Sequence, residues 1–168
     1  MKERGFTLTE MLVTLAIATL LLALAGPAFT RQRAQAALRS ASGQTLAALH
    51  LARRLALARG QSVTVCPSAD GQRCGFDGTE WLLFANVPGG TDSRLDGGEE
   101  LVRRWSLPAG VSVSGTRGYA AFQPRPGAAT TVTFEFRHRS APGMARSVVV
   151  SQTGRPLVVV EGMATTAR

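Results

Sequence analysis

The chain has 168 residues and a basic balance, with 19 lysines and arginines against 11 aspartates and glutamates and a formal net charge of +8. Behind an apolar N-terminal segment about 140 residues remain, which suits one domain with its own hydrophobic core. The two cysteines and two histidines lack the paired spacing of a zinc site. No Ser/His/Asp set, activated cysteine or phosphate-binding glycine loop can be assembled. We therefore predict a structural subunit, not an enzyme, with no catalytic residue, cofactor or metal.

The N-terminus predicts a membrane-inserted helix. Lys2 and Arg4 precede an uncharged run from Met11 to Thr30. About 20 helical residues at 1.5 Å each span a hydrocarbon core of about 30 Å, and the two cations should remain cytoplasmic. Glu10 stands at the start of this run, where a carboxylate is costly unless a cation lies nearby.

Gly5, Phe6 and Glu10 occur together at a spacing that resembles the class III signal of type IV pilins and type II secretion pseudopilins. The resemblance implies that residues 1–5 are a leader, that a prepilin peptidase cuts after Gly5, and that the amine of Phe6 is then methylated. It also implies that Glu10 pairs with the N-terminal amine of a neighbouring subunit in a fibre. The alternatives are an ordinary secretory signal, with its cleavage site at residues 23–25, or a plain membrane anchor.

Residues 31–59 are predicted to continue the helix as an amphipathic half, behind a transmembrane half at residues 6–30. Small and apolar side chains recur at offsets of three and four and form a narrow stripe that a sheet can approach closely. They are Leu38, Ala41, Thr45, Leu49, Ala52 and Ala56. Gly26 and Pro27 should interrupt the helix near the outer membrane boundary. Gly60 should end it, because glycine readily adopts the left-handed conformation.

Residues 60–168 are predicted to form a β-rich periplasmic head. Short β-branched or aromatic runs alternate with clusters of Pro, Gly, Asp and Asn. The runs are residues 62–66, 80–85, 100–107, 111–114, 119–123, 131–137, 147–151 and 157–160. The fold class is therefore α+β, with one long N-terminal helix packed on an antiparallel β-sheet head. The expected core aromatics are Trp81, Phe84, Trp105, Phe122 and Phe134.

Several segments resemble the GspH/FimT branch of pseudopilins, and together with the leader they cover nearly the whole chain. They are residues 58–68 (ARGQSVTVCPS), Cys74, residues 81–84 (WLLF), residues 148–151 (VVVS) and Gly154-Arg155. The resemblance implies a pilin-like, single-pass protein of the inner membrane whose head lies in the periplasm and assembles with other pilins or pseudopilins. The branch contains minor pseudopilins of the type II secretion system and FimT-like minor pilins of type IV pili. Some of the latter capture DNA during natural transformation, and the basic charge favours a FimT-like subunit.

Cys66 and Cys74 flank a loop that contains Pro67, Asp70 and Gly71 and is able to turn back on itself. In the oxidising periplasm we expect a disulfide that pins this loop after the first strand; two free buried thiols are the alternative. The acidic segment 92–100 gathers oxygen atoms, but its spacing does not fit an EF-hand loop. We expect a solvated hairpin there.

Two functions of the head remain open. In the first, the head binds double-stranded DNA without sequence preference through phosphate contacts, with Tyr119 near enough to stack. The candidate arginines are Arg155, which is the first choice, and Arg137, Arg139 and Arg146. DNA-binding members of the branch carry Gly-Arg-x-Arg, whereas residues 154–157 read Gly-Arg-Pro-Leu, without the second arginine. In the second, the head belongs to a GspH-like minor pseudopilin of the type II secretion system that contacts other pseudopilins at the tip and binds no DNA.

Overall fold

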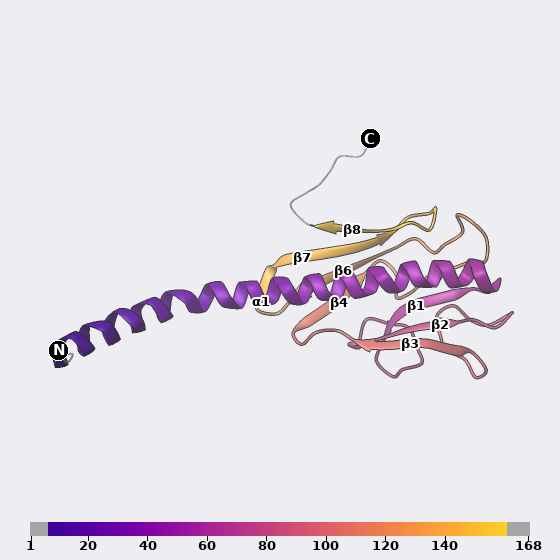
Figure 1. The fold of residues 1–168 in the computed structure, drawn as a ribbon. Helices are drawn as coiled ribbons and strands as arrows, with labels where there is room; N and C mark the ends of the chain where they lie inside the picture. Colours follow the sequence, from indigo (N-terminus) through magenta and orange to yellow (C-terminus); the bar gives the residue numbers. More distant parts are fainter. Residues whose placement is uncertain (1–6, 161–168) are drawn as a thin grey trace, which may run out of the picture.

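The computed structural model describes residues 7–160, which form one long helix followed by eight strands. The helix lies along two antiparallel sheets, and its N-terminal part extends well beyond them (Figure 1). This is the predicted α+β architecture. The predicted leader and the cleavage site at Gly5 and Phe6 lie outside the described residues.

The helix α1 (Leu8–Arg59) is 52 residues long and is capped at both ends. Thr7 is the N-cap. Gly60 is the C-cap, as predicted, with a φ of 66° and an N–H that donates to the carbonyl of Ala56 at 3.1 Å. The helix runs without a break through Gly26 and Pro27. The predicted interruption is therefore wrong, because a proline removes only one bond from a hydrogen-bond ladder that continues on both sides.

The head contains two four-stranded sheets. The first has the order β3-β2-β1-β5 and consists of β1 (Val63–Ser68), β2 (Glu80–Ala85), β3 (Glu100–Ser106) and β5 (Ala120–Phe122). The second has the order β4-β6-β7-β8 and consists of β4 (Val111–Gly115), β6 (Val132–His138), β7 (Ala141–Val150) and β8 (Pro156–Val160). Neighbouring strands are antiparallel throughout. The strands agree closely with the predicted runs, except that β7 begins at Ala141 instead of residue 147.

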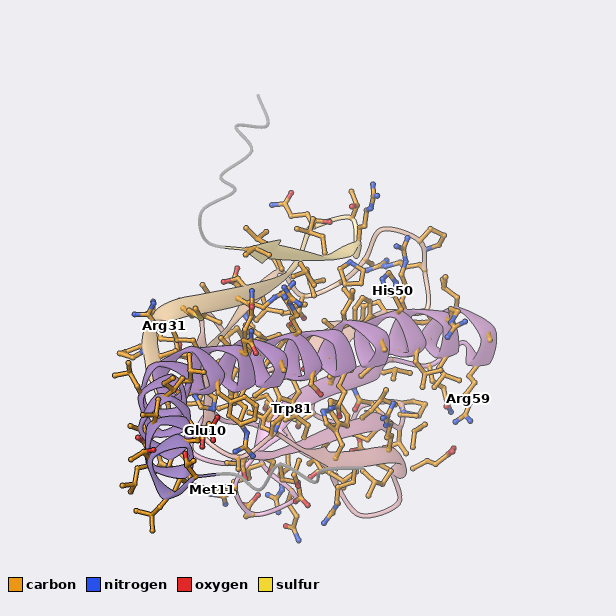
Figure 2. The ribbon with its side chains drawn as sticks, turned by 60° about the vertical axis from the view of Figure 1, so that its left-hand side comes forward. Glu10, Met11, Arg31, His50, Arg59 and Trp81 are labelled. Carbon is orange, nitrogen blue, oxygen red and sulfur yellow. A yellow bond between two sulfur atoms is a disulfide. The ribbon has the colours of Figure 1, made fainter. Side chains whose placement is uncertain are left out.

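The core lies between α1 and the sheets. All six residues of the predicted helix stripe are buried, and all five predicted core aromatics are at most 9% exposed. Trp81 occupies the centre, below α1 in Figure 2, with ring centroids 5.1 Å from Phe134 and 5.6 Å from Trp105. Phe84 instead packs with Cys66 in a smaller cluster on the other side of the first sheet. The small side chains of the stripe let the helix approach these rings closely.

The head has two ends that lie far apart. At the near end, where the N-terminal part of α1 leaves the head, Arg33 lies close to the β6–β7 turn at residues 138–140. At the far end, Arg53 lies close to the β7–β8 turn at residues 153–154. Figure 1 shows β7 running between the two ends. Its ten residues cover about 33 Å, since an extended strand rises about 3.3 Å per residue.

Candidate assembly segment and basic surfaces

A reciprocal pair of hydrogen bonds closes the start of α1. The backbone N–H of Glu10 donates to Thr7 Oγ1 at 3.3 Å, while the N–H and the hydroxyl of Thr7 donate to Glu10 Oε2, both at 3.0 Å. This is a capping box, for which the pattern Thr-x-x-Glu at residues 7–10 is the sequence signal. Among residues 7–160, no cation pairs with Glu10. Its predicted pairing with a neighbour's amine stays a prediction.

Large apolar side chains in the first part of α1 are not covered by the head. More than half of each of these side chains is exposed: Leu8, Met11, Leu12, Val13, Leu15, Ile17, Leu20, Leu21 and Phe29. From Ala34 onward, by contrast, one face of the same helix is buried. Figure 2 shows Glu10 and Met11 on the part of the helix that extends away from the head. Exposed apolar surface of this extent marks a region that contacts a partner or lipid.

Among the residues whose side chains the structure describes, which exclude residues 22–28, no helical stretch is both long and apolar enough to cross a membrane.

Cys66 and Cys74 form a disulfide, as predicted, with Cα atoms 5.4 Å apart. Inside the loop that it closes, Asp70 Oδ1 accepts hydrogen bonds from the N–H groups of Arg73 at 2.7 Å and Gln72 at 2.9 Å. These two donors, that of Arg73 first, hold the pKa of Asp70 below its ordinary value of 3.8, because they stabilise the charged carboxylate. The loop is thus fixed both covalently and by an ionised side chain.

The carboxylates of the acidic segment 92–100 are used within the protein. Asp92 accepts hydrogen bonds from Ser62 Oγ at 2.9 Å and from the amide of Asn86. Glu100 pairs with Arg59, the last residue of α1, at 2.6 Å. Within residues 7–160, no group of three or more His, Cys, Asp or Glu side chains is arranged to hold a metal ion.

The candidate DNA-binding arginines are not brought together into one patch. Arg137 and Arg139 lie near the β6–β7 turn at the near end, whereas Arg155 follows the β7–β8 turn at the far end. Arg137 is also occupied, because it pairs with Glu135 and donates to the carbonyl of Pro142 at 3.3 Å. The expectation that these residues supply neighbouring charge to Arg155 is therefore wrong, since a strand of ten residues separates them.

Arg146 is directed toward α1. It pairs across the sheet with Phe136, and directly opposed residues of antiparallel strands point to the same face. That face is the core face, because Phe136 is fully buried. Arg146 lines a cavity of about 210 Å³ together with Gln35 and Leu38 of α1, and its Nε is buried with no hydrogen-bond partner in the described structure.

Tyr119 does not accompany these arginines either. It packs against the small cluster of Cys66, Leu82 and Phe84. The guanidinium of Arg117 lies 5.9 Å from the centroid of its ring. The expected stacking position beside the candidate arginines is therefore wrong.

A second basic group, at the far end, was not predicted from the sequence. Arg53 from α1 and Arg125 from the β5–β6 loop line the same small cavity as Gly154, and the exposed Arg155 follows directly. We call Arg53, Arg125 and Arg155 the far-end arginines. None of the three forms an ion pair with any other residue that the structure describes. No local signal identifies this group, because its members come from three separate elements.

Comparisons with known proteins agree with this architecture. Residues 1–26 match the prokaryotic N-terminal methylation motif, and residues 41–154 match the family of type II transport protein GspH. No curated protein matches the chain. Among solved structures, the type IV minor pilin FimU of Pseudomonas aeruginosa is similar with a TM-score of 0.59 at 18% identity, over 83% of this chain and 98% of that one. The minor pseudopilin EpsH from the type 2 secretion system of Vibrio cholerae is similar with a TM-score of 0.55 at 14% identity, over 74% of this chain and 98% of that one.

The two similar structures share the fold at low identity, and the matched family covers more than half of the chain. A long N-terminal helix packed on antiparallel sheets, a methylation motif at the N-terminus and the extent of the family match agree with one another. This chain belongs to the GspH family of pilin-like type II transport proteins.

Proposed function

We propose that the chain is the precursor of a minor pilin or pseudopilin. Prepilin peptidase removes residues 1–5 and methylates the amine of Phe6. Residues 6–30 then anchor the protein in the inner membrane, with residues 31–59 and the β-rich head in the periplasm, until the subunit joins a fibre of other pilins. Glu10 pairs with the N-terminal amine of a neighbour during this step.

The observation that carries the proposal is the uncovered apolar start of α1, most of which lies within the N-terminal methylation motif. Surface of this kind needs an apolar surrounding, either lipid or the helices of other subunits. Both surroundings suit the uncharged run Met11–Thr30, because about 20 helical residues match a hydrocarbon core of about 30 Å. From Ala34 onward one face of the helix is buried against the head, so this part needs no lipid or neighbouring helix to cover it.

Processing is the direct test. Mass spectrometry of the membrane fraction should find a mature protein that begins at Phe6 with a methylated amine, and Gly5→Trp should leave the precursor uncut. Gly26→Ala is the matched control and should be processed normally. An N-terminus at Gly26 in the unmodified protein would contradict the proposal, because it would indicate an ordinary signal peptide.

The subunit acts either in a type IV pilus or in a type II secretion system. The similar structures include a type IV minor pilin and a type 2 secretion pseudopilin, and the basic charge of the chain supports the pilus. The genes adjacent to this one distinguish the two, since each machine encodes its minor subunits together.

Double-stranded DNA binding is a second candidate function of the head. The far-end arginines support it, because Arg53 and Arg125 line one small cavity with Gly154, no acid lines that cavity, and Arg155 is the next residue in the chain. The turn at Gly154, with a φ of 70°, presents Arg155 at the surface. Arg139 lies at the other end of the head, so it belongs to a different surface. The alternative is a head whose far end contacts only other pseudopilins.

A further inference from the structure

A basic pocket lies at the near end of the head, beside the point where α1 leaves it. The pocket has a volume of about 380 Å³ and is formed by residues 30–37 of α1, the loop before β4 and the β6–β7 turn. Its polar side chains include Arg33, His138, Arg139 and Ser140. No acidic residue lines it, so the pocket offers hydrogen-bond donors and positive charge to an anion.

His138 is oriented by its neighbours. The N–H of Ser140 donates to His138 Nδ1 at 3.1 Å, so Nδ1 is the acceptor of the ring and Nε2 carries the hydrogen. A Cβ at Gly110, another lining residue, would lie 3.0 Å from Nε2, so the absence of a side chain there leaves space beside the donor. The N–H of Arg139 donates to the carbonyl of Gly110 at 2.9 Å and fixes the turn against this loop.

Arg33 approaches the pocket from the helix. Its guanidinium lies 5.6 Å from the centroid of the Phe29 ring, one turn earlier, and the Phe29 side chain is 59% exposed. An arginine next to an apolar ring can lay its apolar stem along that ring while its guanidinium stays at the polar surface. Arg137, the other arginine near the turn, is occupied by Glu135 and by the carbonyl of Pro142.

The position of the pocket along α1, relative to the membrane, indicates which ligand it meets. Headgroups add roughly 5 to 8 Å to each side of the hydrocarbon core, which corresponds to about four or five helical residues. If the uncharged run ends at Thr30 at the edge of the core, Arg31 and Arg33 lie within the headgroup layer. Figure 2 shows Arg31 at the near end, beside the beginning of β7. This step rests on the membrane anchoring proposed above.

From this geometry we infer that the near-end pocket binds the phosphate of an anionic phospholipid in the outer leaflet of the inner membrane. Arg33 and Arg139 supply positive charge, and His138 Nε2 donates a hydrogen bond. An anionic headgroup suits the pocket better than a zwitterionic one, because no carboxylate among the lining residues is present to receive an ammonium group. The bound lipid ties the head to the membrane surface while the subunit waits to be assembled.

The test uses the full mature chain reconstituted into vesicles of phosphatidylglycerol mixed with phosphatidylcholine, and into vesicles of phosphatidylcholine alone. A ligand that binds only the folded head raises its melting temperature, so the head should melt about 2 to 5 °C higher with phosphatidylglycerol. The double variant Arg33→Gln, Arg139→Gln should lose this shift. The double variant Arg54→Gln, Arg117→Gln removes the same charge from exposed positions outside the pocket and should keep it.

Three results would overturn the inference: equal melting in both vesicles, loss of the shift in both double variants, or an equal shift when inorganic phosphate is added to phosphatidylcholine vesicles. The second result would mean that general attraction of a basic protein to an anionic surface is responsible, and the third that the pocket takes free phosphate. Flotation of the vesicles separates this inference from the proposed function. A chain that inserts into both vesicles but shows no shift overturns only the lipid site, whereas a chain that inserts into neither overturns the anchoring as well.

Discussion

At the scale of single residues, Glu10 combines an observed role in capping α1 with a proposed role in pairing with a neighbouring subunit. Its Oε2 accepts both donors of Thr7 and so completes the cap of α1. Its charge is the property that the pairing with a neighbouring amine requires. A glutamine retains a carbonyl oxygen that can cap a helix, but it has no charge, so substitution at this position distinguishes the two roles.

We expect Glu10→Gln and Glu10→Ala to reduce incorporation into the fibre to a similar degree, with processing at Gly5 and folding of the head intact. The reason is that both lose the charge, whereas only the alanine loses the cap. Thr7→Ala, which removes the cap from the other side, should have a much smaller effect. Quantitative immunoblotting of sheared fibres against the membrane fraction measures this. Normal incorporation of Glu10→Gln would show that the charge is not needed.

Asp70 makes the stability of the head depend on pH. Its pKa is lowered in the folded state by the N–H groups of Arg73 and Gln72, so the ionised form stabilises the fold. This contribution is fully present above the ordinary carboxyl pKa and is lost as the pH falls through the lowered value. Asp70→Asn removes the titration, so its free energy of unfolding should fall less steeply than that of the wild type as the pH falls below the ordinary carboxyl value of 3.8. Urea titrations across this range measure both slopes, and identical slopes would contradict the role of Asp70.

At the scale of elements, the contact of α1 with the sheets depends on small side chains. Ala52 is fully buried, whereas Ala47 on the same helix is exposed. Ala52→Leu should destabilise the head by about 1 to 3 kcal/mol, because a well-packed interface has no room for the added carbons. Ala47→Leu adds the same group to the exposed face and should change stability by less than about 0.5 kcal/mol. Urea unfolding of the two variants decides it, and equal stabilities would mean that the interface is loosely packed.

The disulfide is the second element-scale feature that can be tested. Closing this short loop restricts the unfolded chain by about 2 to 3 kcal/mol in the entropic model. The pair Cys66→Ala, Cys74→Ala should therefore melt at a lower temperature and keep its circular dichroism spectrum. Alanine is the better replacement, since a serine at the buried position 66 would add an unpaired hydroxyl. Thiol labelling of the native periplasmic protein without reductant is the direct check, and ready labelling would exclude the bridge.

The elements themselves could be predicted where local chemistry determines them. The stripe from Leu38 to Ala56 and the β-branched runs predicted the helix face and the strands apart from the start of β7, because burial of one face leaves a period in the sequence. The start of β7 has no such signal: residues 141–146 include Pro142 and Gly143, and the strand is extended there because Ala141, Ala145 and Arg146 pair with β6 on either side of an irregularity in the register. The separation into two sheets likewise depends on pairings between distant residues, which a local pattern does not contain.

At the scale of the whole molecule, the antiparallel register decides which charges act together. Arg137 and Arg155 are close in sequence, but β7 places them at opposite ends of the head. Of the far-end arginines, only Arg155 could be predicted from the sequence, since Arg53 and Arg125 reach the same end of the head only through the fold. This division separates the near-end pocket, for which we propose a lipid ligand, from the far-end arginines, for which we propose DNA.

The DNA prediction follows from this division. A head lacking the membrane helix, residues 31–168, should bind double-stranded DNA weakly and with little sequence preference, and the affinity should fall as salt rises because bound phosphates release counterions. Arg125→Gln with Arg155→Gln should weaken binding several-fold and reduce the salt dependence. Arg137→Gln with Arg139→Gln is the charge-matched control and should have a smaller effect. Fluorescence anisotropy at low salt measures all three, and no binding by the unmodified head would exclude DNA as its ligand.

The lengthwise contact between α1 and the head also determines how the subunit responds to mechanical force. The buried face of the helix extends from Ala34 to Ala56, which at 1.5 Å per residue is about 33 Å parallel to the helix axis. A pull along that axis loads all of these contacts together in shear, whereas a sideways pull would break them one after another. Tension along the helices of a fibre is therefore shared across the whole interface. The head should resist a larger force along the helix axis than perpendicular to it.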